Sequence, residues 1–126
     1  MGVRGIGVTR EEAFEQAALA LSAIVTKLET VRSLQKVEFS CAAPDVELLL
    51  VDWLNAIIYE MATRRMLFSR FQVRLAEGHL VGSAWGESVN LVRHQPAVEP
   101  KGATYTSLAV RQQPDGRWLA QCIVDV

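Results

Sequence analysis

The chain has 126 residues, of which 50% are hydrophobic and 21% are charged. This length and composition suit one compact domain and exclude a disordered or collagen-like chain. The 13 basic and 14 acidic residues give a formal net charge of -1. That balance excludes the large surplus of Lys and Arg with which a protein holds nucleic acid through its phosphates. We therefore expect a single domain over residues 1–126 that does not bind nucleic acid strongly by itself.

A local basic patch is still compatible with this low net charge. Four arginines lie near one another in the middle of the chain: Arg64, Arg65, Arg70 and Arg74. They form either a surface that contacts phosphates or, as charged stretches usually do, a solvated outer face.

No segment has the features of a membrane span or a signal peptide. No apolar run approaches the roughly 20 residues that cross a bilayer, and Met1–Val8 lacks the apolar core of a signal peptide. Cys41 and Cys122 form neither a Cys-x-x-Cys pair nor a Cys/His cluster, which argues against zinc. We expect no membrane contact and a cytoplasmic location.

The first part of the chain predicts a strand, a helix and a second strand. Met1–Val8 favours a short glycine-rich strand that runs into a turn. Thr9 and Glu12 then form a capping box for a helix, whose apolar residues recur at helical spacing to about Lys27. In Gln35–Ala42 apolar and polar residues alternate with a period of two, as in a half-buried strand.

A second helix is predicted to start at Pro44-Asp45, because proline is tolerated in a first helical turn and Asp favours a helix N-terminus. Val46–Met61 is apolar almost all round, which is typical of a buried central helix. Asp52 interrupts it. A buried carboxylate must be paired, metal-bound or protonated. Asp52 is therefore either part of a structural ion pair or an anion in a site cleft.

The rest of the chain predicts two hairpins separated by a loop. The turn signals Glu77-Gly78 and Gln113–Gly116 each lie between two β-rich segments. The strands are expected at Arg70–Leu75, Leu80–Trp85, Thr104–Val110 and Arg117–Val124, with Val89–Lys101 as a proline-containing loop. The whole order predicts an α+β domain with a mainly antiparallel sheet of about six strands packed with two helices.

Three polar residues near this loop are candidates for a functional site. Glu87 ends a predicted strand, where the plainer interpretation is a surface charge at the end of a hairpin. His94 and Lys101 flank the proline-containing segment, and a loop histidine either faces solvent or acts as a site donor. No nucleophile elbow, phosphate-binding loop or His-Glu-x-x-His motif is present, so the sequence predicts no enzyme.

The C-terminus brings two anionic groups together. Asp125 is the last residue but one, so its side chain lies one residue from the α-carboxylate of Val126. Paired carboxylate oxygens suit a hard cation such as Ca²⁺ or Mg²⁺. The plainer interpretation is that Asp125 is simply solvated.

Several of these segments together resemble the archease family. They occur in the family's order: Leu49–Asn55 (LLVDWLN), Leu67–Phe71 (LFSRF), Ala84–Glu87 (AWGE), Arg93-His94, Lys101–Tyr105 (KGATY), Trp118 and Ile123–Val126 (IVDV). The resemblance covers essentially the whole chain, including both predicted helices. It implies an α+β accessory protein that is not itself an enzyme.

What the resemblance implies about partners is specific. Archeases assist the GTP-dependent ligase that joins tRNA halves, and they promote its guanylylation and repeated turnover. They bind a divalent metal, Ca²⁺ in the first instance, through aspartate oxygens and the C-terminal residue. They have also been described as chaperones or specificity modulators of tRNA methyltransferases. The expected partner is the tRNA-splicing RNA ligase, with a tRNA methyltransferase as the alternative.

On this resemblance, Asp125 and Val126 match the metal ligands. Asp52, His94 and Lys101 match polar positions that we expect around the same site, with Glu87 beside them. Asp52 would order the metal. His94 and Lys101 would face the ligase, its bound guanylate or its phosphate groups.

The chain departs from the family's pattern in two places. Family members begin with a His-Thr-Ala-Asp-like stretch, whereas Met1–Arg4 starts just after it, so we expect the family's first strand and one aspartate ligand to be missing. Thr106 follows Tyr105 where the family often has His. A small metal-dependent hydrolase is a third class of function, but no nucleophile–base pair or metal triad supports it.

Overall fold

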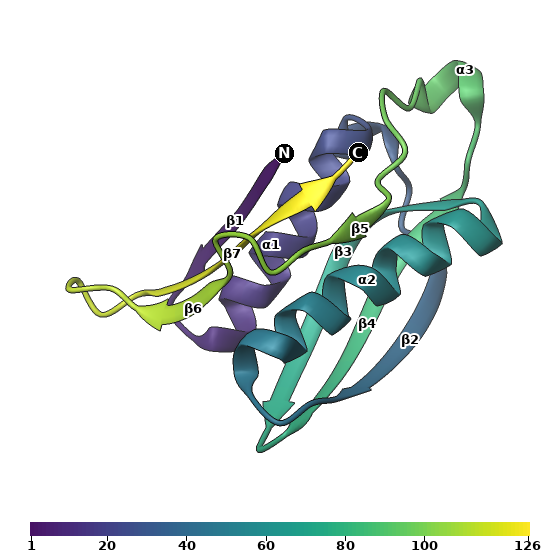
Figure 1. The fold of residues 1–126 in the computed structure, drawn as a ribbon. Coiled ribbons are helices and arrows are strands. Elements are labelled where there is room, and N and C mark those ends of the chain that lie inside the picture. The colour runs from purple at the N-terminus through teal and green to yellow at the C-terminus, as the bar shows by residue number, and fades with distance from the viewer.

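The computed structural model describes residues 1–126, and its strands form two antiparallel sheets (Figure 1). In one sheet β7 pairs with β1 on one side and with β5 and β6 on the other. Its strands are β1 (Gly2–Gly7), β5 (Gly102–Ala103), β6 (Ala109–Gln112) and β7 (Trp118–Asp125). The other sheet has the order β2–β4–β3, with β2 (Gln35–Ala42), β3 (Met66–Ala76) and β4 (His79–Ser88). The predicted α+β class is confirmed, but seven strands share two sheets.

The two long helices lie on the same side of the three-stranded sheet, and α1 is sandwiched between that sheet and β1 and β7 (Figure 1). The helices are α1 (Arg10–Val25) and α2 (Val46–Arg64), with short turns at η1 (Leu28–Thr30) and α3 (Leu91–His94). The indole Nε1 of Trp53 donates to the carbonyl of Phe14 at 3.2 Å and so links the two long helices inside the core. None of the helices combines the length and the apolar character needed to span a bilayer.

The predicted start of α1 is confirmed in part. Thr9 is the N-cap, and its hydroxyl accepts from the Glu12 amide at 3.1 Å. No hydrogen bond returns from the Glu12 side chain, so only half of the capping box forms. Strand β1 lies so close to α1 that a Cβ on Gly5 would be 2.1 Å from the Ala13 carbonyl oxygen. Gly5 therefore serves close packing between strand and helix.

Helix α2 corrects two expectations. Its N-cap is Asp45, whose carboxylate accepts from the Leu48 amide at 2.9 Å, so Pro44 lies before the helix and not in its first turn. Asp52 is exposed and takes part in no ion pair, so the expectation of a buried carboxylate is wrong. Asp52 shares with Tyr59, seven residues on, the one stripe of α2 that faces solvent.

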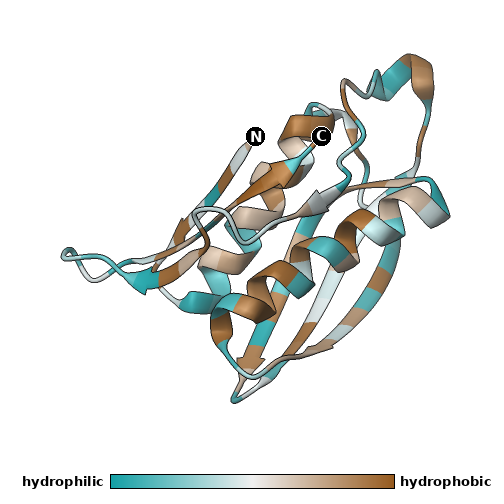
Figure 2. Cartoon of the chain, in the orientation of Figure 1, coloured by the Kyte–Doolittle hydropathy of each residue, from teal (hydrophilic) through white to brown (hydrophobic).

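The three-stranded sheet has one buried and one open face. Alternate residues of β2, β3 and β4 point toward the helices, and the alternation is visible as bands along β2 in Figure 2. A bulge in β3 between Phe68 and Arg70 sends both Phe68 and Phe71 to the core side. Four aromatic rings meet there with edge or tilted contacts: Phe39, Trp53, Phe68 and Phe71.

Two predictions for the last third of the chain are wrong in detail. Of the strand expected at Thr104–Val110, only Ala109 and Val110 lie in a strand, at the start of β6, because Tyr105–Leu108 closes a turn in which Ser107 has a φ of 54°. The loop expected at Val89–Lys101 contains the single helical turn α3. Neither segment can be predicted from hydrophobic periodicity, because each is only about four residues long.

Candidate functional site

The loop between β4 and β5 is held as a rigid turn by its own polar side chains. Asn90 caps α3, with its side-chain oxygen accepting from the amides of Val92 at 3.1 Å and Arg93 at 3.0 Å. Gln95 ends the turn in the left-handed region, with a φ of 46°. A helix this short is not stable by itself, so its shape must come from these caps and from the contacts of Arg93 and His94.

Glu87 is the anchor to which this turn is attached. Its carboxylate is buried, although it lies at the end of β4 where the sequence suggested a surface charge. Arg93 donates to both of its oxygens, at 2.6 and 2.7 Å, in the bidentate geometry that makes such pairs strong. The Arg32 amide donates to it at 2.7 Å. The carboxylate is thus fully paired, as a buried charge requires.

His94 completes the anchor in a defined tautomer. Its Nδ1 accepts from the Asn90 amide at 2.8 Å, so Nδ1 carries no proton. The Nε2 nitrogen lies 3.0 Å from the Glu87 carboxylate and therefore holds the proton and donates it. His94 is buried and neither faces solvent nor is free to contact a partner, which corrects the role expected for it.

These contacts set the charge state of Glu87. The hydrogen bonds from Arg93, more than the opposing effect of burial, hold the pKa of the Glu87 carboxyl far below its usual range. The same pairing raises the pKa of the Arg93 guanidinium. Glu87 and Arg93 are therefore both ionised at neutral pH, and the anchor is an ion pair there.

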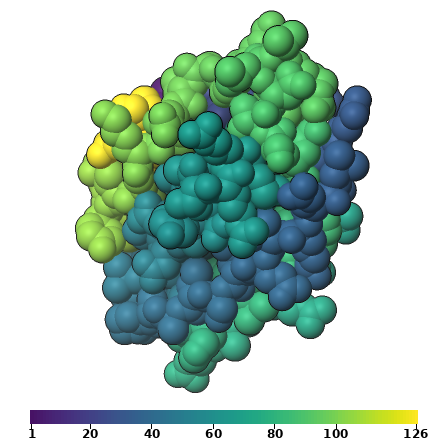
Figure 3. Space-filling view, turned by 90° about the vertical axis from the view of Figure 1, so that its right-hand side faces the viewer, coloured from purple at the N-terminus to yellow at the C-terminus, as the bar shows by residue number.

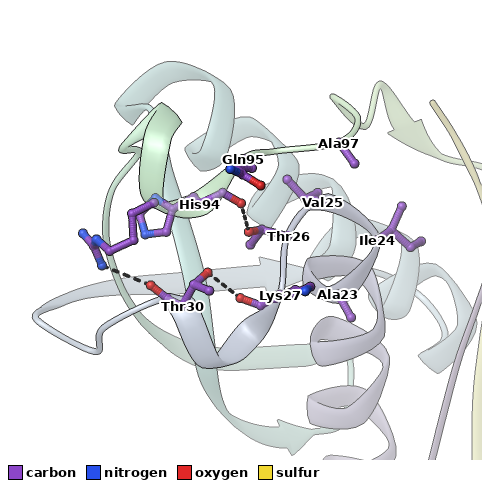
Figure 4. A pocket seen from close by; sticks show the side chains of 10 residues that line it. Ala23, Ile24, Val25, Thr26, Lys27, Thr30, His94, Gln95 and Ala97 are labelled. Carbon is purple, nitrogen blue, oxygen red and sulfur yellow. Dashed lines mark hydrogen bonds between the residues drawn. The ribbon is translucent and has the colours of Figure 1, made fainter.

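The turn is also attached to the end of α1. The hydroxyl of Thr26 donates to the His94 carbonyl at 2.6 Å, and the Arg93 guanidinium donates to the Thr30 carbonyl at 3.0 Å. Figure 4 shows Thr26, Thr30 and His94 around the shallow pocket that these contacts enclose, about 420 Å³ in volume. The amide of Ala97 donates to the Val25 carbonyl and continues the attachment. The loop is therefore fixed to the domain on two sides.

The outer surface of this fixed turn is apolar. Val92 is 83% exposed and Leu91 is 74% exposed, more than any other large hydrophobic side chain of the protein. Leu91 also borders a groove of about 580 Å³ between the C-terminal end of α2 and the loop, and nine of the thirteen residues that line it are hydrophobic. Residues around α3 form the top of the molecule in Figure 3. We refer to Leu91, Val92 and this groove as the α3 surface.

A second group of candidate residues meets at the C-terminal end of β7. The Lys101 amide donates to the Asp125 carbonyl at 2.7 Å, and β5 pairs beside it through Gly102 and Asp125. From α2, Asn55 accepts from the Ala103 amide at 2.8 Å. The side chains of Lys101 and Asp125 are both exposed there.

The structure does not gather all six candidates into one site. Glu87 and His94 are in contact, and Lys101 lies beside Asp125, but no hydrogen bond or ion pair joins these two groups or links either of them to Asp52. No three or more His, Cys, Asp or Glu side chains are grouped so that they could hold a metal ion. Asp125 and the Val126 carboxylate fit a hard cation in kind, but they are fewer than the oxygens such a cation takes.

Sequence reasoning missed the residues that shape the α3 surface. Arg93 was noticed only as a neighbour of His94, although it is the principal partner of Glu87. Asn90, three residues before Arg93, is a capping signal that could have revealed the turn. The exposure of Leu91 and Val92 carries no such signal, because apolar residues in a loop are equally compatible with burial.

The fold and these contacts define a small α+β domain that presents a braced apolar turn. Residues 1–126 match the model of the archease protein family (MTH1598/TM1083) over their whole length. The chain belongs to the archease family.

Several relatives are similar along nearly the whole chain. Protein archease of Pyrococcus furiosus is 32% identical over 130 residues, which cover 100% of this chain and 92% of that protein. Protein archease of Methanopyrus kandleri is 37% identical over 122 residues, covering 94% of this chain and 86% of that protein.

Solved structures agree with this assignment. The solution structure of Methanobacterium thermoautotrophicum protein 1598 has a TM-score of 0.85 and 30% identity, covering 99% of this chain and 91% of that chain. The crystal structure of a Thermotoga maritima archease, described as a possible chaperone, has a TM-score of 0.64 and covers 100% of this chain and 90% of that chain. At 16% identity, the second likeness concerns the fold alone.

Proposed function

We propose that this protein is a non-catalytic accessory factor that activates the GTP-dependent tRNA-splicing RNA ligase, promotes its guanylylation and sustains its repeated turnover in the cytoplasm. The proposal follows from membership of the archease family and from one observation: the exposed apolar pair Leu91 and Val92 on a turn fixed from beneath. We propose that the α3 surface contacts the ligase.

Rigid attachment of the turn is what makes this surface suitable for a protein partner. Isolated exposed hydrophobic residues are common, but two adjacent ones beside an apolar groove mark an interaction site more often. A flexible loop would lose conformational freedom on binding, whereas a turn already fixed by Glu87, Arg93 and His94 avoids most of that cost. The anchor residues thus support binding without touching the partner.

The test is a multiple-turnover ligation assay with the cognate ligase and increasing amounts of the accessory protein. Wild-type protein should raise the number of turnovers per ligase. The variant Leu91→Asp/Val92→Asp should need at least about tenfold more protein for half-maximal activation, since loss of an interface anchor costs about 1–2 kcal/mol or more. Its thermal unfolding should stay close to that of the wild type because both side chains already face solvent.

Val8→Asp provides the matched control. Val8 is 72% exposed but lies after β1, away from the α3 surface. The Val8→Asp variant should activate the ligase as well as the wild type does. If Leu91→Asp/Val92→Asp activates like the wild type, the α3 surface is not the contact. If the wild type does not affect the ligase at any concentration, the proposed function itself fails.

We further propose that Asp125 and the Val126 carboxylate bind a divalent cation, Ca²⁺ in the first instance. Two adjacent exposed carboxylates attract a hard cation, and Ca²⁺ completes its shell of six to eight oxygens with backbone carbonyls and waters. Water or the ligase would have to supply the remaining ligands. Lys101, which lies beside Asp125, is proposed to influence this end of the molecule through charge only, and Asp52 is proposed to take no direct part in it.

A chaperone or specificity modulator of a tRNA methyltransferase is the second candidate. The same apolar α3 surface favours it, because exposed hydrophobic groups also retain unfolded or partly folded clients. Light scattering of a heated methyltransferase distinguishes the two. Suppressed aggregation that Leu91→Asp/Val92→Asp abolishes, together with no effect on a ligase, would favour this candidate over the first.

A further inference from the structure

The open face of the β2–β4–β3 sheet is a second surface that the proposed function does not use. Both long helices cover the opposite face, and no other element lies over this one. The register aligns its side chains in rows across the three strands. One row contains Lys36, Trp85 and Arg70, and another contains Ser40, Val81 and Arg74. Between them lies a row of Glu38, Ser83 and Gln72.

Trp85 is at the centre of a cationic row. The Arg70 guanidinium lies 4.3 Å from the centre of the indole ring, and the Lys36 ammonium lies 5.6 Å from it. The bulge in β3 after Phe68 brings Arg70, instead of Ser69, opposite Trp85. Bulges commonly re-aim a side chain in this way. The indole is only partly covered, so one aromatic surface and two cations face solvent together.

The charge of this face differs from that of the whole molecule. It has three cations, Lys36, Arg70 and Arg74, and one carboxylate, Glu38, in a chain whose net charge is -1. Glu38 lies 3.3 Å from Lys36, but both side chains are well exposed and their pairing is weak. The four arginines of the sequence patch are divided: Arg64 pairs with Glu60, and Arg65 caps α2, so Arg70 and Arg74 alone share the sheet.

We propose that this open face binds single-stranded RNA, with Trp85 and Arg70 stacking on bases and Lys36 and Arg74 contacting phosphates. Single-stranded RNA is recognised by stacking on aromatic rings and on guanidinium planes, often across an open antiparallel sheet. Ser83 and Gln72 lie in the row between the cations and Ser40 lies in the row of Arg74, and their hydroxyl and amide groups can pair with 2′-hydroxyls.

A protein partner fits this face less well. The cores of protein interfaces are apolar and poor in Lys and Glu, whereas only Val81 and Trp85 are large apolar residues here. The inference is independent of the ligase, because it concerns the isolated chain and RNA. Two phosphate contacts are few, so the affinity should be low, in keeping with the small net charge.

Fluorescence anisotropy of a fluorescein-labelled oligouridylate tests the proposal with the purified chain. The dissociation constant should lie between about 10⁻⁴ and 10⁻⁶ M, and two phosphate contacts predict a slope of about -1.4 for log K against log salt. Arg70→Glu/Arg74→Glu should weaken binding at least about tenfold. Trp85→Leu should weaken it about fivefold to a hundredfold, the loss expected for one stacked base.

Arg4→Glu/Arg111→Glu is the charge-matched control, because both arginines are exposed on the other sheet. It should bind RNA like the wild type. Arg74→Glu alone, which does not touch Trp85, provides a second test if the other variants fold poorly, and should weaken binding severalfold.

Three results would overturn the proposal: no binding by the wild type, equal loss in the control, or equal affinity for the matching single-stranded DNA. No RNA binding together with loss of ligase activation in Arg70→Glu/Arg74→Glu would assign this face to a protein instead.

Discussion

Glu87 shows how a single residue can fix the shape of a whole loop. Its two oxygens accept from the Arg93 side chain, the Arg32 amide and His94, three donors that belong to two distant parts of the chain. Removing Glu87 would leave the Arg32 amide and the His94 Nε2–H without this acceptor, and removing Arg93 would leave the buried carboxylate without its cation. The loop therefore has one stable arrangement, in which Leu91 and Val92 point outward.

Glu87→Gln should lower the melting temperature at pH 7 and loosen the α3 turn. The glutamine side chain has the same shape as glutamate but lacks the negative charge that pairs with the Arg93 guanidinium. The pKa of the Glu87 carboxyl is lower in the folded than in the unfolded protein. The stabilisation by the Glu87 charge is therefore complete above the ordinary carboxyl pKa near 4.5, and it is lost as pH falls from there through the pKa of the folded state. Thermal unfolding of both proteins from pH 7 to pH 2 should show their difference shrink only on the acid side of pH 4.5.

Glu60→Gln is the control for this prediction, because Glu60 forms an i,i+4 pair with Arg64 on the surface of α2. Such pairs contribute little, so its melting temperature should follow the wild type at every pH. A constant difference between Glu87→Gln and the wild type across the whole range would show that the charge of Glu87 does not stabilise the fold.

The identity of the candidate residues could be predicted better than their surroundings. Glu87 and His94 were selected from the sequence, but their contact depends on a loop whose turn is set by Asn90 and Gln95. Asp52 was expected to be buried because its neighbours are apolar. Those neighbours, Leu49, Leu50, Trp53 and Leu54, all lie on the other side of α2. Composition of a helix does not reveal the width of its solvent-facing stripe.

At the scale of elements, β1 packs against α1 with no room for a side chain at residue 5. A Cβ on Gly5 would lie 2.1 Å from the Ala13 carbonyl oxygen and 2.2 Å from the Ala17 amide nitrogen, both of which are backbone atoms in a helix. Backbone atoms of a helix cannot rotate away as a side chain can. Strand β1 therefore reaches its place beside β7 only because residue 5 lacks a side chain.

Gly5→Ala should destabilise the protein by about 1–3 kcal/mol, the usual cost of forcing extra atoms into a filled core. Chemical denaturation monitored by circular dichroism measures this change. Gly2→Ala is the matched control in the same strand, since its Cβ would meet only the Ile123 side chain, at 3.8 Å. Equal stability of Gly5→Ala and Gly2→Ala would mean that β1 can move away from α1 at little cost.

Helices and strands with a clear hydrophobic periodicity were predicted well, and short turns were not. Gln35–Ala42 was predicted with the observed bounds of β2, because alternation over eight residues fixes both its type and its inward face. Thr104–Val110 was predicted as one strand. Ser107 instead adopts a positive φ, which serine does not favour, and only Ala109 and Val110 of that range are in a strand.

At the scale of the whole molecule, three proposed functions occupy three different places. The α3 surface lies at one extremity, the open sheet face on the side away from the helices, and the Asp125–Val126 carboxylates at the C-terminal end of β7 (Figure 1). No hydrogen bond or ion pair connects these three places directly. Substitutions at one place should therefore leave the other two functions intact, which makes the proposals separable by experiment.

The C-terminal carboxylates predict weak binding of Ca²⁺ that depends on Asp125. Two anionic ligands with the rest of the shell from water suggest a dissociation constant of about a millimolar, the weak end of the range for protein calcium sites. Asp125→Asn should weaken binding at least about tenfold in a calorimetric titration. Asp52→Asn removes one exposed carboxylate elsewhere and should bind like the wild type. Equal binding by Asp125→Asn, or none by the wild type, would refute the proposed site, and a loss with Asp52→Asn would add that carboxylate to the ligands.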